Sequence, residues 1–420
     1  LPGDIADEPA TSDVTPVAVP EPGVLVPSAG VVEKLAAEIN AAEKVAIFAG
    51  AGAAGAHDEL MRLASKAKAP VGHSLRGKDF VQYDNPFDVG MTGLLGYGAA
   101  AEGIEDADLM IMVGTDFPYD QFLPDTRTVQ IDARAEVLGR RTAVDLPIQG
   151  DVKATLDAVL PLVEEKKNSK FLDKTLKKHE KLMDKAVGAY TRKVEKHTPI
   201  HPEYAASLLN EALADDAIVT ADTGMCNVWS ARYIQPTGRS RLIGSMLHGS
   251  MANALPQAIG AQFAHPDRQV VAMCGDGGLS MLMGDMLTAR AYDLPLTLAV
   301  FNNSTLGMVK LEMLVDKLPD FGVDVPEVNY AAIAQAMGWH AIRVENPKDL
   351  EKAYAEALSH KGPSLVDIVT DPMALSIPPK ITSDQVFGFA TAMSRIVLNG
   401  GAGEAVAMGR SNLRNIPRSW

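Results

Sequence analysis

Residues 270–278 read VVAMCGDGG, and this stretch decides the fold. A run of apolar residues that ends in glycines around one acidic residue is typical of a buried strand that enters a tight turn and opens a helix. Glycine lets the backbone approach a ligand closely, and the N-terminus of a helix favours a phosphate group. Asp276 in this turn is therefore a candidate ligand for a hard cation that bridges such a phosphate.

A second strand ends in polar residues at a matching distance. Residues 296–303 read LTLAVFNN, and Asn303 stands 27 residues after Asp276. This interval fits a helix with its loops, which is the length of one crossover between parallel strands. We therefore expect adjacent parallel strands to bring Asp276 and Asn303 together at one edge of a sheet. One carboxylate and one amide oxygen, completed by backbone oxygen, phosphate and water, suit octahedral Mg²⁺.

The same alternation of apolar strands and amphipathic helices extends through the chain. It predicts an α/β fold with two doubly wound parallel sheets, each covered by helices on both faces. Ligands bind beyond the C-terminal strand ends of such sheets. We expect helices at 31–42 and 57–68, and strands at 45–49, 109–113, 128–131, 217–220, 242–244, 270–274, 296–301, 341–344 and 365–369.

Composition divides the chain into five parts. A Pro-rich segment comes first, and a Lys-rich connector, which we interpret as a solvated helix face, separates two α/β domains. The predicted boundaries are 1–30 for the first segment, 31–163 for the first domain, 164–199 for the connector, 200–371 for the second domain and 372–420 for a C-terminal tail.

Length and charge exclude several classes of protein. The 420 residues are 47% hydrophobic, which excludes wholesale disorder. A net charge of −14 argues against nucleic-acid binding, because a duplex needs a dense positive face. The two cysteines, Cys226 and Cys274, are too few for a disulfide framework and suit a reducing cytoplasm. We expect no membrane span and no signal peptide.

The motif of Gly-Asp-Gly followed by Asn-Asn resembles that of thiamine diphosphate (ThDP, also called thiamine pyrophosphate) enzymes. Residues 249–258, 281–285 and 376–379 extend the likeness to the ThDP- and FAD-dependent pyruvate oxidases that feed electrons to a quinone. In that family a pyrimidine-binding domain, an FAD-binding middle domain, a diphosphate-binding domain and a membrane-binding tail follow one another. This sequence resembles the last three, and residues 1–4 resemble the end of the first.

The resemblance implies a role for each residue of the second domain's motif. Asp276, Asn303 and the backbone oxygen of Thr305 would bind Mg²⁺, Gly249 would contact the aminopyrimidine, and Met251 would force the cofactor into its bent shape. The implied ThDP set is Asp222, Thr223, Gly224, Gly249, Ser250, Met251, Asp276, Gly277, Gly278, Asn303, Thr305, Leu306, Gly307 and Met308.

The first domain carries the stretches that resemble the family's FAD site. Gly50 and Gly52 follow a strand and would admit a pyrophosphate, and Asp132 at another strand end would accept from adenosine hydroxyls. Glycine after a strand also has the simpler reading of a turn. The implied FAD set is Gly50, Gly52, Arg76, Met91, Thr92, Gly93, Leu94, Gly114, Thr115, Asp116, Phe117, Pro118 and Asp132.

Residues 302–309, NNSTLGMV, fit acetolactate synthases equally well. Those enzymes continue with Gln-Trp, whereas this chain has Leu311-Glu312, and pyruvate oxidases resemble it in having Glu there. Glu312 would position water or tune proton transfer, Met251 would shape the cofactor, and Met308 replaces a frequent Phe in the quinone-linked enzymes. A surface charge on a helix is the simpler reading of Glu312.

The tail combines cationic and apolar residues. Ser383 is expected to cap a helix whose apolar face carries Val386, Phe389, Met393 and Ile396, and Arg410, Arg414 and Arg418 follow together with Leu413, Ile416 and Trp420. This pattern suits an anionic membrane surface. A loose C-terminus without a partner is the alternative.

Together the resemblance implies oxidative decarboxylation of pyruvate to acetate and CO₂ by way of hydroxyethyl-ThDP, with electrons passing through FAD to a membrane quinone, ubiquinone or menaquinone. It also implies a homotetramer in the cytoplasm, held peripherally at the inner face of the cell membrane. The ThDP-activating Glu of the family belongs to the missing first domain, so we expect the fragment alone to have little turnover. Acetolactate synthesis, a phosphate-dependent pyruvate oxidase and a non-catalytic cofactor-binding fragment are the alternatives.

Overall fold

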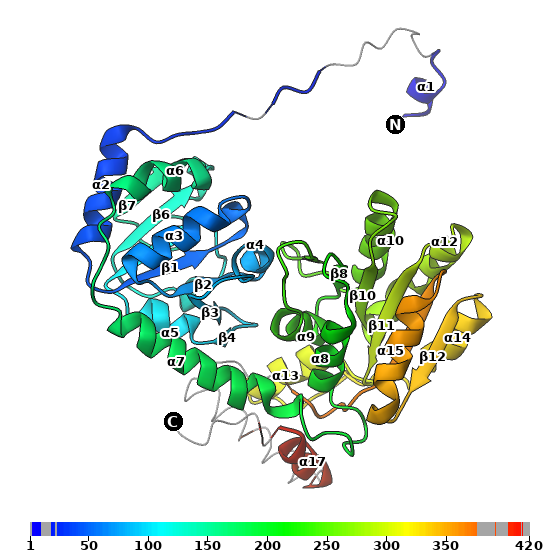
Figure 1. Cartoon of the computed structure of the whole chain (residues 1–420). Coiled ribbons are helices and arrows are strands. Elements are labelled where there is room, and N and C mark those ends of the chain that lie inside the picture. The colour runs from blue at the N-terminus through cyan, green and yellow to red at the C-terminus, as the bar shows by residue number, and fades with distance from the viewer. Residues whose placement is uncertain are drawn as a thin grey trace.

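The computed structural model describes residues 2–9, 18–21, 23–375, 391, 402–412 and 414. Two α/β units lie side by side, and the N-terminal segment with α1 (Gly3–Ala6) extends away from them (Figure 1). Each unit is one sheet with helices on both faces, so the predicted fold class is confirmed for the described residues.

The first sheet has seven strands in the order β4-β3-β2-β1-β5-β6-β7, and only the β3–β4 pair is antiparallel. The chain order reverses between β1 and β5, which places the C-terminal ends of these two strands at the point where such sheets bind ligands. The strands are β1 (Val45–Ala49), β2 (Val71–His73), β3 (Asp88–Met91), β4 (Tyr97–Gly98), β5 (Leu109–Val113), β6 (Thr128–Asp132) and β7 (Leu146–Gln149).

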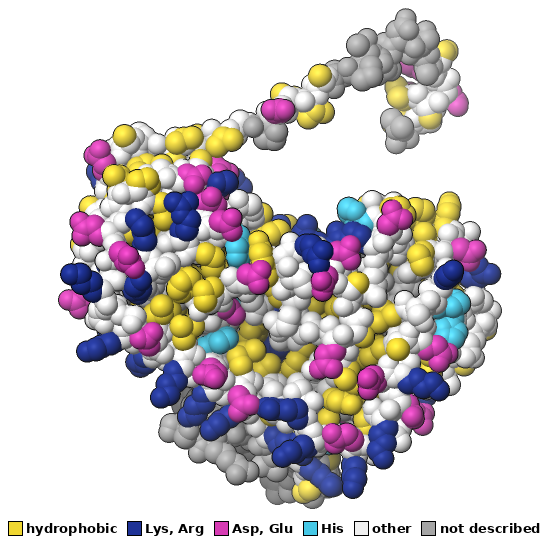
Figure 2. Space-filling model, in the orientation of Figure 1, with side chains coloured by type: hydrophobic (Ala, Val, Ile, Leu, Met, Phe, Trp, Pro, Cys, Tyr) yellow, Lys and Arg dark blue, Asp and Glu magenta, His cyan; other side chains and the backbone are white. Residues whose placement is uncertain are grey.

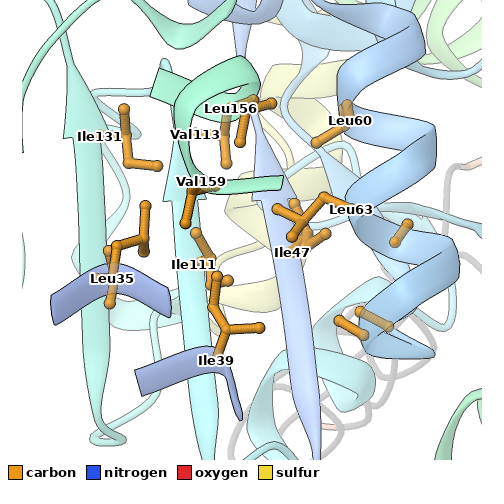
Figure 3. Close-up of a cluster of buried hydrophobic side chains, with 14 of the residues drawn as sticks. Leu35, Ile39, Ile47, Leu60, Leu63, Ile111, Val113, Ile131, Leu156 and Val159 are labelled. Carbon is orange, nitrogen blue, oxygen red and sulfur yellow. The ribbon is translucent and has the colours of Figure 1, made fainter. Parts of the chain in front are cut away.

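Every residue of β1 is buried because both faces of this sheet are covered. Ile47 points toward the helices α2 (Ala29–Ala41), α3 (His57–Ala67) and α6 (Val152–Val159), whereas Phe48 points to the opposite face, where Ile104 of α5 (Ala100–Glu105) packs. Figure 3 shows the first of these clusters, in which Leu60 and Leu63 of α3 lie over the strands.

The second sheet is entirely parallel, in the order β12-β13-β11-β10-β8-β9. β10 and β11 pair from Val270 with Leu296 to Gly275 with Phe301, so the predicted neighbourhood of these two strands is confirmed. The order reverses between β8 and β10. The strands are β8 (Ile218–Ala221), β9 (Arg241–Gly244), β10 (Val270–Gly275), β11 (Leu296–Asn302), β12 (His340–Val344) and β13 (Ser364–Val369).

Two further buried clusters join helices to the faces of this sheet (Figure 1). One face carries α8 (Pro202–Ala212), α9 (Met225–Tyr233) and α15 (Leu350–Ser359), and the other carries α10 (Ala254–Ala264), α12 (Met286–Ala291) and α14 (Tyr330–Ala336). The remaining helices of this part are α11 (Asp276–Leu282) and α13 (Gly307–Val315), which both begin at the C-terminal edge of the sheet.

The Lys-rich connector contains the helix α7 (Lys170–Lys185), which runs along the lower edge of the first unit in Figure 1. Its apolar side packs against that unit, with Leu172 buried and Leu176 in contact with the cluster around Val89. The lysines at 170, 174, 177, 178, 181 and 185 are exposed. At helical spacing they form one stripe on the side away from the core, as a solvated helix face requires.

Part of the tail packs against the second unit. Met408 of α17 (Ala402–Asn412) is buried against Leu314 and Leu375, and the Asn412 side chain donates to the backbone oxygen of Met373 at 2.7 Å. The expected helix from Ser383 through Ile396, residues 376–379 and Leu413, Ile416, Arg418 and Trp420 lie outside the described residues. Within the described part, no helix combines the length and apolar character needed to cross a bilayer.

We expect Leu63→Ala to lower the free energy of unfolding by about 2–5 kcal/mol, because it leaves a cavity in a fully buried cluster. Urea unfolding measures this change. Leu162→Ala is the matched control, since Leu162 is 46% exposed and its loss should cost less than about 0.5 kcal/mol. Equal effects of the two substitutions would contradict the packing described for α3.

Candidate cofactor site

A pocket that is partly open to solvent lies at the C-terminal edge of the second sheet. It sits where the strand order reverses between β8 and β10, the position at which open α/β sheets bind ligands. Its walls are formed by Pro202, Asp222, Thr223, Gly224, Met225, Cys226, Trp229, Met251, Gly275, Asp276, Gly277, Gly278, Phe301, Asn303, Thr305, Leu306, Gly307, Met308, Val309, Thr370 and Ala374.

The Asp276 carboxylate joins the two strand ends that the sequence predicts to meet. One of its oxygens accepts from the backbone N–H of Gly277 at 2.8 Å. The other accepts from the backbone N–H groups of Asn303 at 3.1 Å and Ser304 at 2.6 Å. Ser304 has a positive φ of 53°, so the chain turns sharply enough for consecutive amides to point at one carboxylate.

Asn303 and Thr305 complete a set of oxygen donors beside Asp276. The Asn303 side-chain oxygen accepts from the Thr305 backbone N–H at 3.1 Å, which fixes the orientation of its amide. One carboxylate, one amide oxygen and one backbone carbonyl form a donor set that fits Mg²⁺ and does not fit a soft metal. Among the described residues no three His, Cys, Asp or Glu side chains gather into a metal site.

Burial raises the pKa of the Asp276 carboxyl, and the N–H groups of Gly277, Ser304 and Asn303 only partly oppose this effect. A bound divalent cation would favour the ionised carboxylate and lower the pKa again. The site is thus built so that a cation supplies the charge that the backbone amides leave uncompensated.

Asp222 at the end of β8 is the second acid of the pocket and is only 2% exposed. Its Oδ1 accepts from the backbone N–H of Ala254 at 2.9 Å, whereas Oδ2 has no hydrogen-bond partner among the described residues. The Thr223 hydroxyl is also buried without one. Buried polar atoms without a partner call for an explanation, and a ligand or water molecule that donates to them would supply one.

The glycine turn of the pocket tolerates no side chain. A Cβ on Gly278 would lie 2.3 Å from Asp222 Oδ2, and a Cβ on Gly277 would lie 2.8 Å from Leu306 and 3.4 Å from Met251. The turn, Met251 and Leu306 therefore converge on one small space. The glycines let the backbone at the start of α11 approach a diphosphate, and the oxygen ligands beside them fit its cation.

The structure gathers twelve of the fourteen predicted ThDP residues around the pocket. Gly249 and Ser250 are exposed and flank Met251 without lining it. Glu312 lies on α13 one turn beyond Met308, is exposed, and is not among the lining residues. The catalytic roles of Glu312, Met251 and Met308 stay predictions.

Sequence reasoning missed several parts of the pocket. Helix α9 supplies Met225, Cys226 and Trp229, and the Tyr330 hydroxyl donates to the backbone oxygen of Asp276 at 3.0 Å. The place of α9 could have been predicted from the sequence, because this helix begins directly after the predicted site residues Asp222-Thr223-Gly224. No sequence pattern indicates the contact of Tyr330, because α14 reaches Asp276 only through tertiary packing.

The glycines predicted for FAD meet at the edge of the first sheet, but they pack on one another. A Cβ on Gly52 would lie 2.7 Å from the Gly114 Cα, and a Cβ on Gly50 would lie 2.6 Å from the Gly114 oxygen. The physical reason we expected, an approach of a pyrophosphate, is therefore not needed to explain these glycines. Close contact of the two loops accounts for them.

The other predicted FAD residues lie at the same edge. Met91, Thr115 and Asp132 are buried at strand ends, and the Thr92 hydroxyl is buried with no partner among the described residues. Gly93 lies against the ring of Phe117. The remaining members are more open: Arg76, Leu94 and Pro118 are exposed, and Asp116 pairs with Arg140 and Arg141. The unpaired Thr92 hydroxyl after β3 and the strand-order reversal between β1 and β5 are compatible with a nucleotide, and FAD stays a proposal.

Asp276→Asn should weaken binding of ThDP in the presence of Mg²⁺ by about 100-fold, because it removes the only carboxylate of the donor set. Calorimetric titration of the complete gene product measures this affinity. Asp316→Asn, a change of an exposed carboxylate at the end of α13, is the control and should leave the affinity unchanged. An unchanged affinity of the Asp276→Asn protein would contradict the assignment of Mg²⁺ to this site.

Asp222→Asn should raise the free energy of unfolding at about pH 7.5 by about 2–3 kcal/mol. Burial raises the pKa of Asp222 from 3.8 to about 6, so the folded state holds the proton more tightly than the unfolded state does. That contribution to stability is complete below about pH 4 and is lost as the pH rises through about 6. Denaturant unfolding at several pH values checks both the gain and its disappearance in acid, with the exposed Asp216→Asn as control.

Comparison with known protein families agrees with this geometry. The family description of the C-terminal TPP-binding domain of thiamine pyrophosphate enzymes matches residues 222–368, and that of their central domain matches residues 32–159. The first match contains most of the pocket residues. The second contains all seven strands of the first sheet and begins inside α2.

Three curated relatives illustrate the range of the family. YdaP of Bacillus subtilis, whose name assigns it thiamine pyrophosphate, is 36% identical over 84% of this chain and 61% of its own length. Pyruvate oxidase of Lactiplantibacillus plantarum is 30% identical over 86% of this chain and 59% of its own length. The acetolactate synthase large subunit of Lactococcus lactis is 28% identical over 85% of this chain and 63% of its own length.

The chain thus spans about three fifths of the length of these relatives. The matches cover both sheets and the pocket between β8, β10 and β11. The chain belongs to the thiamine pyrophosphate enzyme family, of which it carries the central domain and the C-terminal cofactor-binding domain.

Proposed function

We propose that the complete protein oxidatively decarboxylates pyruvate to acetate and CO₂ with ThDP, Mg²⁺ and FAD, and passes the electrons to a membrane quinone. The observation that carries the proposal is the pocket itself: one carboxylate, one amide and one backbone oxygen beside a glycine cradle at a strand-order reversal. The relative named pyruvate oxidase supports the choice of substrate and reaction.

The chain's own residues have defined tasks in this proposal. Asp276, Asn303 and the Thr305 carbonyl hold the cation, and the backbone at Gly277 and Gly278 receives the diphosphate. Bound ThDP supplies the nucleophilic carbon that decarboxylates a 2-oxo acid, and bound FAD supplies the two-electron acceptor.

The walls of the pocket around these polar groups are mainly apolar. Trp229, Phe301 and Met308 line it, and they would exclude water from the reacting carbon and strengthen the electrostatic interactions inside. Met251 lies close to Gly277 and lines the pocket, so it would contact a bound cofactor.

Acetolactate synthesis is the second candidate. Relatives that bear this name match the chain at 28–30% identity, close to the 30% of the pyruvate oxidase. Leu311-Glu312 in place of Gln-Trp argues for the oxidase. Since Glu312 is exposed and outside the pocket, the decision belongs to experiment.

The quinone, the lipid contact and the homotetramer belong to the proposal through the sequence pattern of the tail and the family resemblance. Arg410 is exposed, as a lipid contact requires, whereas the Arg414 guanidinium lies 5.2 Å over the Tyr190 ring and donates to the backbone oxygen of Lys193. We therefore place the lipid contact of this segment at Arg410 and assign Arg414 to holding the segment on the protein.

Anaerobic absorbance of the complete gene product, with ThDP and Mg²⁺, tests the reaction. Addition of pyruvate should bleach the oxidised flavin band, and the Asp276→Asn protein should keep it. An oxidised band that persists while pyruvate is consumed would replace the proposal with carboligation. If the purified protein contained no flavin, the roles of FAD and the quinone in the proposal would be contradicted.

A further inference from the structure

A buried lysine connects the two units. Lys78 belongs to α4 (Lys78–Val81) of the first unit and is 1% exposed. Its ammonium donates to the Tyr97 hydroxyl at 3.0 Å within that unit and to the backbone oxygen of Ala231, on α9 of the second unit, at 2.8 Å. A lysine is rarely buried so completely unless its partners hold it.

Other polar bonds cross the same boundary in both directions. Arg232 of α9 is buried and donates to the backbone oxygen of Gly96 in the first unit at 3.3 Å. Asp79 of α4 accepts from the Leu242 backbone N–H at 2.7 Å and from Arg241 at 3.2 Å. The C-terminal end of α9 is thus fixed to the first unit by hydrogen bonds whose partners leave little freedom of position.

The N-terminal end of the same helix is a wall of the pocket. Met225, Cys226 and Trp229 line it, and the helix has only nine residues. Because a short, buried helix moves as one body, a displacement at Met225 reaches Ala231 and Arg232. Figure 1 shows α9 on the side of the second unit that faces the first.

The segment that α9 meets in the first unit contains predicted flavin contacts. Met91, Tyr97 and Ala231 share one buried cluster, and Leu95 packs both there and against the cluster that includes Met225 and Met308. Residues 91–98 therefore contact the pocket wall through side chains, while Met91 to Leu94 are the residues expected at the flavin.

We propose that occupancy of the pocket is transmitted along α9 to residues 88–98 of the central domain, and that Lys78 is the positioning residue of this connection. The inference rests on the proposed function in one respect, namely that ThDP with Mg²⁺ is the ligand of the pocket. It does not require flavin, and it adds a link between two sites that otherwise lie in separate domains.

The electrostatic surroundings of Lys78 support this role. Burial lowers its pKa to about 7, and the nearby carboxylates of Asp88 and Asp79 partly oppose the effect. His73, Arg232, Arg241 and Glu203 also lie near this boundary, together with His179 of α7, whose Nε2 lies 4.0 Å from an Asp88 oxygen. Loss of the ammonium would leave the Ala231 oxygen and the Tyr97 hydroxyl without this donor inside the boundary, at a cost that loosens it.

Hydrogen exchange of the complete gene product, with and without ThDP and Mg²⁺, tests the connection. In the wild-type protein the ligands should slow exchange at residues 275–278 and 303–308 and also, by about fivefold or more, at residues 88–98. In Lys78→Met the pocket residues should remain protected while the effect at 88–98 disappears. The readout is the difference between bound and free protein, which a general loss of stability does not produce.

Lys66→Met is the matched control. Lys66 also donates to two backbone oxygens, those of Leu160 at 2.9 Å and Val163 at 2.8 Å, but all three residues belong to the first unit. This variant should keep the ligand effect at 88–98.

The outcomes separate the two proposals. Absence of protection at 275–278 and 303–308 in the wild-type protein would overturn ThDP as the ligand and the connection with it. Protection of the pocket without any effect at 88–98 would overturn the connection alone. An effect at 88–98 that survives in Lys78→Met, or that is lost equally in Lys66→Met, would overturn the role of Lys78.

Discussion

The Asp276 carboxylate is the group on which the second unit is organised. It follows β10 directly, yet it accepts from amides that follow β11, so it joins the ends of these two strands. Tyr330 then fixes the carbonyl of the same residue from α14. Asp276 therefore holds two strand ends together in the folded chain and would also bind a cation. The hydrogen bonds that give it the first role also fix its carboxylate for the second.

Polar atoms buried without partners add a second constraint. A folded chain normally satisfies such atoms, because each one left alone costs free energy. Asp222 Oδ2 and the Thr223 hydroxyl lack a hydrogen-bond partner among the described residues, and both residues line the pocket. Asp222 Oδ2 lies so close to Gly278 that a side chain at that position would collide with it. A ligand or water molecule that donates to these atoms would remove that cost.

Local pattern was enough to predict nine strands, among them β10 and β11, since VVAMCG and LTLAVF are apolar runs bounded by turns and parallel pairing follows from their spacing. It did not predict the short strands β2, β3, β4 and β7 of the first sheet. It was also enough for Asp276 with Asn303. It could not show that α9 reaches from the pocket to Lys78, because helix α9 has apolar and buried residues on all sides and therefore no readable periodicity. The glycines after β1 show that loop packing and ligand approach demand the same residue, so their assignment to FAD stays a prediction.

The parallel register of β10 and β11 has a consequence for how this fold tolerates change. Val270 faces Leu296 and Gly275 faces Phe301 without a break, so the acid and the amide reach the edge together. A residue added inside either strand would turn every later side chain to the opposite face. The number of residues in the helical crossover between the two strands is not restricted in this way, because its loops can lengthen at little entropic cost. An insertion in the segment between the two strands should therefore disturb the site less than an insertion inside either strand.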